Sequence, residues 1–411
     1  MYRIDHPRDA QALLLLLFGS GWATNHFVAL IPVFRETGSY LDGSLEIAFG
    51  LYALGLVPSL LVGGYLADRF NERKLTLLGT AAVIAGNLAL VLFVTPLATA
   101  LARLIVGIGV GLAISSGNAW MGRISPHGGS ALAGTLLSAG FAIGPFVAGF
   151  IASFSPYPLN LTLAITTTVA LSALSMLVLA WGGLRSRPTR TDSAWASPSL
   201  AATRSAAPTR PAAPATPARP TDAPAGSVRR ALAWAIPMAL WVFSVGSLPM
   251  VVIPAQLGGA FAGSLAAGVL AFVTLGTGVT MQLIARARAF GPKAGVVGAL
   301  LAALGFVTLA LFGTPVTPGV AFVASVLFGV AYGLCLRAGL IDIERFAPAH
   351  RRGLAGGIFY VVAYLGFALP YALTAALPVL GPALPLFGLA AIAAGAALLR
   401  VFQIWRQPSG Q

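Results

Sequence analysis

The sequence predicts an all-α integral membrane protein with twelve transmembrane helices, arranged as two parallel repeats of six. Three observations predict this fold: the composition, a series of long apolar runs, and short motifs that recur at one constant offset. Hydrophobic residues make up 57% of the 411 residues, only 9% are charged, and the mean hydropathy is +0.87. An ordinary soluble domain is roughly half apolar. The composition therefore indicates a membrane protein.

The apolar runs are long enough to span a bilayer, which takes about 20 mostly apolar residues per helix. The first run is too long for a secretory signal, because it continues to Val33, and Asp5 and Asp9 lie at its start. Outside the runs, no stretch is apolar enough to form a separate soluble core. The predicted spans are approximately 11–33, 44–67, 75–95, 97–121, 130–153, 158–182, 230–255, 260–284, 294–313, 317–341, 354–376 and 379–402.

The formal charge of +14 is explained by topology. With the N-terminus in the cytoplasm, all Lys and Arg residues except Arg35, Arg103 and Arg337 fall in cytoplasmic segments or at their edges. This is the distribution of the positive-inside rule. We therefore expect a multi-pass protein of the cell membrane with both termini cytoplasmic, and no nucleic-acid partner. The single cysteine, Cys335, excludes an intramolecular disulfide and a Cys-based metal site.

A change of composition divides the chain into two halves. Residues 185–230 are rich in Pro, Ala, Ser, Thr and Arg, and such a segment cannot bury enough apolar surface to fold. We predict a six-helix bundle over 1–184, a disordered cytoplasmic linker over 185–230, and a second six-helix bundle over 231–411.

The two halves repeat each other at one constant offset in residue number, which is called the repeat offset below. Because each half has an even number of spans, the repeats are parallel, as in transporters that bind substrate between their halves. The positions that match at the repeat offset are Ile31-Pro32 with Ile253-Pro254, Pro126 with Pro348, Leu132-Ala133-Gly134 with Leu354-Ala355-Gly356, and Gly144 with Gly366.

The charged loop after the second span carries a specific motif. Its sequence, Gly64-Tyr-Leu-Ala-Asp68-Arg69-Phe-Asn-Glu-Arg73-Lys74, resembles the loop 2–3 signature of the major facilitator superfamily. Gly64 and Asp68 are four residues apart and share one helix face. The resemblance implies a conformational latch of Gly64, Asp68, Arg69 and Arg73, in which Asp68 meets the N-terminus of span 11, where an anion is favoured. A solvated positive-inside loop is the alternative.

The loop departs from the family pattern at two positions. Asn71 replaces the turn glycine, which is tolerable because asparagine adopts left-handed conformations more readily than most residues. Glu72 replaces a base, which makes the predicted latch less positive.

Two further motifs resemble those of the same family. Arg103-Leu-Ile-Val-Gly107-Ile-Gly109 resembles the span 4 motif, which implies that Arg103 takes part in proton coupling and that Gly107 packs against a neighbour. An arginine snorkelling to the outer interface is the alternative. The span 5 segment resembles the motif of family exporters, and its small residues and proline predict a gate or packing seam. The seam residues are Gly140, Gly144, Pro145 and Gly149, and their counterparts Val362, Gly366 and Phe367 predict that the seam belongs to the first half alone.

Span 1 supplies the candidate cavity residues Trp22, Asn25 and His26. His26 is also a candidate proton site, because imidazole titrates near neutral pH, although a packing histidine is the alternative. No span carries an acid in its middle third. Asp342 and Glu344 lie near the inner end of span 10, and Arg337, one to two turns before them, is their predicted neutralising partner.

These observations predict secondary active transport of a small molecule by alternating access, in the form of proton-coupled efflux of an amphipathic compound. The alternatives are a proton symporter that imports a sugar or small metabolite, and a transport-inactive sensor on the same fold. No P-loop, cofactor motif, metal cluster or nucleophile–base pair is found, so we expect no enzyme activity and no cofactor. We expect the small-molecule substrate, protons and the lipid bilayer as partners of a monomer.

Overall fold

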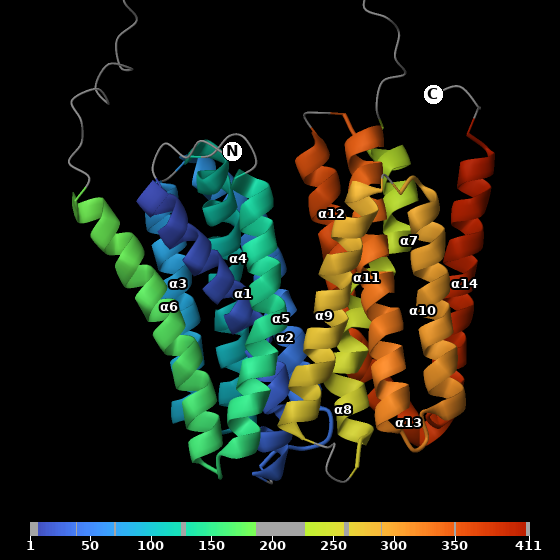
Figure 1. Cartoon of the computed structure of the whole chain (residues 1–411), viewed down its shortest axis with the longest axis horizontal. Coiled ribbons are helices and arrows are strands. Elements are labelled where there is room, and N and C mark those ends of the chain that lie inside the picture. The colour runs from blue at the N-terminus through green and yellow to red at the C-terminus, as the bar shows by residue number, and fades with distance from the viewer. Residues whose placement is uncertain are drawn as a thin grey trace, which may run out of the picture.

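The computed structural model describes residues 7–37, 39–69, 71–124, 129–185, 227–258, 263–288, 290–348 and 351–407. Within these ranges the chain is helical and contains no strand, and its helices form twelve spans long and apolar enough to cross a membrane (Figure 1). The predicted all-α fold with twelve spans is confirmed. The predicted linker falls almost entirely in 186–226, outside the described residues.

The first half contains six long helices that run alternately between the two ends of the molecule. Four helix termini lie at the same end of the molecule, which is called the linker end below: the start of α1, the end of α6, the start of α7 and the end of α14 (Figure 1). The helices of this half are α1 (Pro7–Glu36), α2 (Ser44–Arg69), α3 (Glu72–Leu92), α4 (Pro96–Ile124), α5 (Gly129–Phe154) and α6 (Leu159–Arg185).

The second half contains six spans, two of which are interrupted helices. The spans are α7 (Val228–Ser247) continued by η1 (Leu248–Val252) and α8 (Ile253–Gln256), α9 (Ser264–Ala287), α10 (Lys293–Phe312), α11 (Pro318–Phe346), α12 (Arg352–Tyr364) continued by η4 (Leu365–Ala368) and α13 (Leu369–Leu380), and α14 (Leu384–Trp405).

Both interruptions occur close to prolines, which cannot donate a helix hydrogen bond. The π-helical turn η1 contains Pro249 and is followed by Pro254. The 3₁₀ turn η4 is followed by Pro370. Hydropathy alone predicted neither interruption, because the apolar run continues through both.

The internal repeat is confirmed by matching helix contacts. A Cβ atom placed on Gly144 of α5 would lie 2.8 Å from the Trp22 Cα of α1. At the matching positions of the second half, a Cβ on Gly366 would lie 2.2 Å from the Ser244 nitrogen of α7. The prediction that this seam belongs to the first half alone is therefore wrong for Gly366.

A second contact repeats in the same way. A Cβ atom on Gly107 of α4 would lie 2.1 Å from the Tyr52 oxygen of α2, and one on Gly329 of α11 would lie 2.5 Å from the Thr274 oxygen of α9. Gly329 matches Gly107, and Thr274 matches Tyr52, at the repeat offset. Glycine lets the two backbones meet directly in both halves, as small residues do at helix interfaces in membranes.

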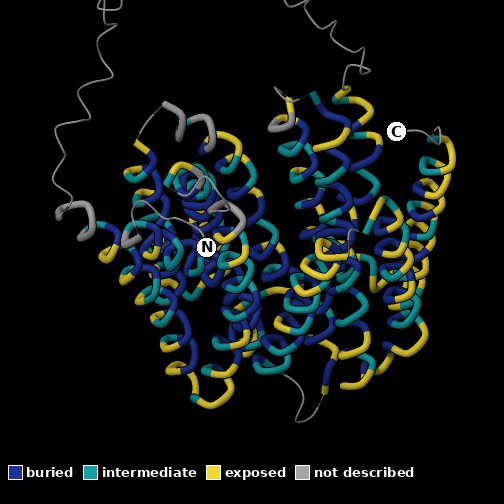
Figure 2. Tube along the Cα trace, turned by 45° about the horizontal axis from the view of Figure 1, so that its top comes forward, coloured by how far each residue is buried: buried dark blue, intermediate teal, exposed yellow. Residues whose placement is uncertain are grey.

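Buried residues face the interior of each bundle, and exposed residues cover its outside (Figure 2). Many exposed side chains are large and apolar, among them Leu54, Leu177 and Phe322. A soluble protein rarely exposes so much contiguous apolar surface. Such a surface suits contact with lipid.

Candidate functional site

The two halves meet mainly toward the end opposite the linker end, where α2 and α9 begin and the ribbons come closest (Figure 1). The rings of Phe49 and Phe367 are 4.9 Å apart there, and a Cβ on Gly149 of α5 would lie 2.3 Å from the Ser264 oxygen of α9. The seam glycine Gly149 therefore contacts the other half, whereas Gly140 contacts Phe18 and Gly144 contacts Trp22 within the first half.

A small cavity lies between the halves, with a volume of about 30 Å³. At ~15 Å³ per water, this space has room for about two water molecules. The cavity is lined by Thr24, Asn25, Tyr52, Phe141, Phe243, Gly246, Met250, Leu275, Tyr332, Tyr364 and Phe367.

The second half supplies a wall of aromatic rings to this cavity. Phe243 stacks on Tyr364 with a centroid distance of 4.5 Å and on Phe367 at 4.8 Å. No charged side chain is among the described lining residues. Aromatic faces attract apolar groups and cations. These rings were not among the residues predicted from the sequence, although Tyr360, Tyr364 and Phe367 recur at helical spacing.

Arg103 is fully buried in the first half, on α4, beside the cavity residues Thr24 and Tyr52. Its Nη2 atom donates a hydrogen bond of 3.1 Å to the Thr24 carbonyl oxygen, and its Cζ atom lies 4.7 Å from the centroids of both the Phe27 and Tyr52 rings. Nε and Nη1 have no hydrogen-bond partner among the described residues. No described carboxylate forms an ion pair with Arg103. The guanidinium is thus held by aromatic faces and one carbonyl.

The three span 1 candidates have different surroundings. Asn25 lines the cavity, and its Nδ2 atom donates to the Phe141 carbonyl oxygen at 3.3 Å. The Trp22 Nε1 atom donates to the Thr168 hydroxyl of α6 at 2.9 Å, away from the cavity lining. His26 is fully buried, with Nδ1 3.1 Å from the Ala23 oxygen and with Nε2 unpartnered among the described residues.

Residues of the charged loop join α3 to α4 and α6 of the first half. Arg73 donates to the carbonyl oxygens of Leu179 and Ala180 on α6, the second at 3.0 Å, and Glu72 forms an ion pair with Arg123 of α4. Glu72 therefore binds a base inside the first half. The side chains of the other latch candidates, Gly64, Asp68 and Arg69, lie outside the described residues.

Asn71 does not adopt the left-handed conformation that the sequence suggested. Its φ is −68°, and its Oδ1 atom accepts a hydrogen bond of 3.2 Å from the Lys74 nitrogen. Asn71 is the N-cap of α3, a role that asparagine fills well because its side chain satisfies a free backbone donor.

A buried ion pair occupies the linker end of the second half. Arg400 of α14 donates to Asp342 of α11 at 2.5 Å, and their side chains are 1% and 7% exposed. The Arg400 Cζ atom also lies 5.0 Å from the Trp234 ring centroid. The prediction that Arg337 neutralises Asp342 is wrong, because Arg400, 58 residues away along the chain, reaches it instead.

Comparison with known proteins places this geometry among transporters. The family model described as Major Facilitator Superfamily matches residues 13–371. The comparison with curated proteins gave no significant match.

Three solved structures share the fold over nearly their whole length. A peptide transporter POT in complex with sulfate has a TM-score of 0.73 and 13% identity, covering 97% of this chain and 94% of its own. The xylose transporter XylE from E. coli, in an inward open conformation, has a TM-score of 0.69 and 16% identity, covering 100% and 98%. The POT family transporter PepTSo has a TM-score of 0.73 and 11% identity, covering 97% and 98%.

Proposed function

The chain belongs to the Major Facilitator Superfamily, and from that premise we propose that it exports an amphipathic small molecule in exchange for protons by alternating access. The protein acts as a monomer in the cell membrane, with the linker end in the cytoplasm. The two bundles rock about the substrate cavity between them, as in other transporters built from parallel repeats.

The observation that carries this proposal is the aromatic, uncharged lining of the cavity. A peptide carries a charged amino group and a charged carboxylate, and both would lack a partner of opposite charge here. A sugar would have the hydroxyl groups of Thr24 and the tyrosines and the Asn25 amide as its only side-chain hydrogen-bond partners among the described lining residues. For an apolar or cationic compound, the aromatic lining best compensates for the contacts with water that are lost on entering the site.

The proposed proton-coupling group is the buried Arg103, with His26 beside it on α1. An ionisable residue inside a membrane protein is costly and is a functional candidate for that reason. A change of protonation near Arg103 would act on Thr24 and Tyr52, because Arg103 contacts both and both line the cavity. The loop of Gly64, Asp68, Arg69 and Arg73 is the proposed latch at the linker end.

A second candidate function is proton symport of a small metabolite. It is favoured by the printed names of the solved neighbours, which are peptide and xylose transporters. The low sequence identity shows only the fold, so the substrate must be decided by the cavity. A transport-inactive sensor is the third candidate, and it would bind a ligand without moving protons.

The test uses purified protein in liposomes loaded with a pH-sensitive dye, under an imposed pH gradient. Lipophilic cations, neutral drugs, sugars and dipeptides are added in turn. We expect lipophilic cations to drive proton movement in the opposite direction to substrate. Arg103→Ala should lower this flux about tenfold or more, which corresponds to about 1.4 kcal/mol or more of activation free energy. Arg288→Ala, at an exposed arginine just beyond α9, is the matched control and should retain the flux.

The direction of proton movement separates the candidate functions. Movement with a dipeptide or sugar in the same direction would establish symport and overturn export. Binding without any proton movement would establish the sensor or an uncoupled carrier. An Arg103→Ala protein as active as the Arg288→Ala control would overturn the coupling role of Arg103.

A further inference from the structure

A second and larger cavity opens on the side of the molecule, between α2 and the interrupted span α12–η4–α13. Its volume is about 380 Å³. It lies in the part of the interface where the two halves are in contact, so it is separate from any opening at the linker end. Two of its lining residues, Leu54 and Leu365, are each 63% exposed on the outside of the bundles. Exposed apolar side chains on a membrane-spanning bundle suit contact with lipid, which would make the groove accessible from the bilayer.

The groove and the central cavity share a wall. Tyr364 and Phe367 line both spaces. On the cavity side Phe367 stacks on Phe243, and its ring also meets the edge of Phe49 of α2. Phe367 belongs to the 3₁₀ turn η4, directly before the Pro370 region of α13. A 3₁₀ turn within a longer helix often marks a hinge. The wall is thus two aromatic side chains at a break in a helix.

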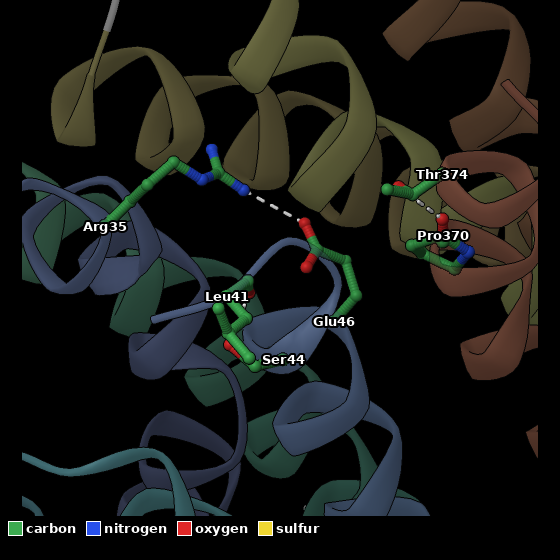
Figure 3. Close-up of polar contacts among 6 residues, drawn as sticks. All are labelled: Arg35, Leu41, Ser44, Glu46, Pro370 and Thr374. Atoms are coloured by element: carbon green, nitrogen blue, oxygen red, sulfur yellow. Dashed lines mark hydrogen bonds and ion pairs between the residues drawn. The ribbon is translucent and has the colours of Figure 1, made fainter. Parts of the chain in front are cut away.

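Glu46 is the charged residue among the described lining residues of the groove. Its Oε1 atom accepts a hydrogen bond of 2.9 Å from Arg35, whose side chain is 45% exposed (Figure 3). The same close-up places Pro370 and Thr374 of α13 across from this pair. The rest of the lining is almost entirely apolar. Arg35, which is not a lining residue, already pairs with this carboxylate, so a positive group in the groove would share Glu46 with Arg35 while a hydrocarbon part fills the apolar lining.

We infer that this groove binds a cationic amphiphile dissolved in the membrane, with its hydrocarbon chain along α2 and η4 and its ammonium group beside Glu46. Tyr364 and Phe367 form the gate between the groove and the central cavity. The inference rests on the proposed function and deepens it, because it names the substrate class and, since the groove lies toward the end opposite the linker end, the route by which the exported substrate leaves the aromatic site for the outer half of the bilayer.

A phospholipid chain is the competing occupant. It would fill the apolar part of the groove equally well, but it would gain nothing from the carboxylate. Dependence of binding on Glu46 and on a positive head group therefore separates the two occupants.

The test is photo-labelling of the full-length protein in lipid nanodiscs. The probe is dodecyltrimethylammonium with a diazirine at the chain end, and the comparison probe has the same chain ending in a hydroxyl group. Mass spectrometry locates the adducts, which we expect on α2 and η4 near Leu54 and Leu365. Gly50→Leu fills the groove, and its Cβ has room because the nearest atom, the Phe367 oxygen, lies 3.7 Å away. Ala368→Leu, at an exposed lining residue, is a second filling variant.

Both filling variants should lower labelling by about tenfold, equivalent to about 1.4 kcal/mol of binding free energy. The matched control is Gly388→Leu on α14, where no atom lies within 4 Å of the new Cβ, and it should label like the wild type. Glu46→Gln should weaken labelling by the cationic probe and leave the neutral probe unchanged. Phe367→Ala should extend the adducts to Phe243 and Met250 in the central cavity.

Undiminished labelling of both filling variants would overturn the groove as the binding site. An equal response of both probes to Glu46→Gln would assign the groove to a lipid chain and overturn the cationic occupant. Because labelling needs no proton gradient, it is read independently of transport. Groove labelling in a protein that moves no protons would therefore reject the proposed exchange and retain the binding site.

Discussion

Arg103 shows how a single residue is kept in the apolar interior without an ion pair to any described carboxylate. Its guanidinium lies between two aromatic faces and bonds one backbone carbonyl. Arginine suits this position because its planar group stacks on rings, whereas lysine carries a compact and strongly hydrated charge. Arg103→Lys should therefore be a poor replacement in spite of its equal charge.

The buried pair of Asp342 and Arg400 makes a residue-scale prediction about stability. Replacing one partner, as in Asp342→Asn or Arg400→Met, leaves the other buried and unpaired and should lower the free energy of unfolding by about 3–5 kcal/mol. The double variant Asp342→Leu with Arg400→Met should recover most of this loss, because no charge is left buried. Thermal unfolding in detergent measures both effects.

The control for this prediction is the pair of Arg35 and Glu46, in which Arg35 is 45% exposed and Glu46 is buried. Glu46→Gln should change stability by about 1 kcal/mol or less, because water already screens one partner. A double variant as unstable as the single ones would show that Asp342 and Arg400 act through packing with Trp234 rather than through their charges.

At this scale the sequence predicted which residues are unusual better than it predicted their partners. An arginine within an apolar run is visible as a candidate, and Arg103 is indeed a transmembrane arginine. The bond between Asp342 and Arg400 joins two helices that are distant in sequence, so no local pattern reveals it. The same holds for the aromatic wall, whose rings come from several helices.

At the scale of helices, the paired glycine contacts predict equal behaviour in the two halves. Gly144→Ala and Gly366→Ala each place a Cβ against the backbone of a neighbouring helix, which should cost about 1–3 kcal/mol of stability. Their matched controls on the same spans are Gly134→Ala and Gly356→Ala, where no atom lies within 4 Å of the new Cβ. These should be neutral or stabilising by up to about 1 kcal/mol, since alanine favours helix more than glycine does.

The four variants are compared by thermal unfolding of purified protein. Because Gly134 matches Gly356 at the repeat offset, as Gly144 matches Gly366, each measurement in one half has a direct counterpart in the other. Destabilisation at Gly144 without destabilisation at Gly366 would mean that the second seam is more pliable than its geometry indicates.

The sequence was enough to predict how many spans the chain has, whereas it was less able to locate the ends and interruptions of the helices. The last span was predicted to begin at 379, but α13 continues to Leu380 and α14 begins at Leu384. The apolar run passes through this turn, so hydropathy cannot locate it. Gly381, with φ of +67°, marks the turn and was the available signal. The start of α7 at Val228 is likewise set by the capping Ser227 rather than by hydropathy.

At the scale of the whole molecule, the close backbone approach of α5 and α9 between the halves is a candidate pivot. A Cβ on Gly268 of α9 would lie 2.5 Å from the Pro145 oxygen of α5, and Gly149 lies similarly close to Ser264. These contacts are at the end away from the linker. Opening that end requires α5 and α9 to separate or tilt there, and the same rocking movement brings the two halves together at the linker end.

Spin labels at the linker end test this movement. Leu132 of α5 and Leu354 of α12 are exposed there and can be replaced by cysteine in a Cys335→Ala background. Gly268→Leu should separate α5 from α9 at the end opposite the linker end, and it should shift the population toward the shorter label distance. Asp68→Asn should remove the proposed latch at the linker end and shift it toward the longer distance. Double electron–electron resonance measures both distributions.

Equal distance distributions in Gly268→Leu and the wild type would exclude the pivot. If Asp68→Asn changed neither the distances nor the transport rate, the loop would be a solvated positive-inside segment instead of a latch. Gly276→Leu, on the same helix with no atom within 4 Å of its new Cβ, is the control for a bulky side chain on α9.

The two repeats share one helical scaffold, but they carry different functional side chains. Arg103 and His26 correspond to Ser325 and Leu248 in the second repeat, and Phe243 and Tyr364 correspond to Gly21 and Ala142 in the first. The proposed proton-coupling residues and most of the substrate-facing rings thus belong to different halves of the molecule. A proton bound in one half can influence a molecule held by the other half only through the interface between the two halves. The exchange ratio of such a carrier would accordingly be set by mutations along that boundary as readily as by changes in either binding site.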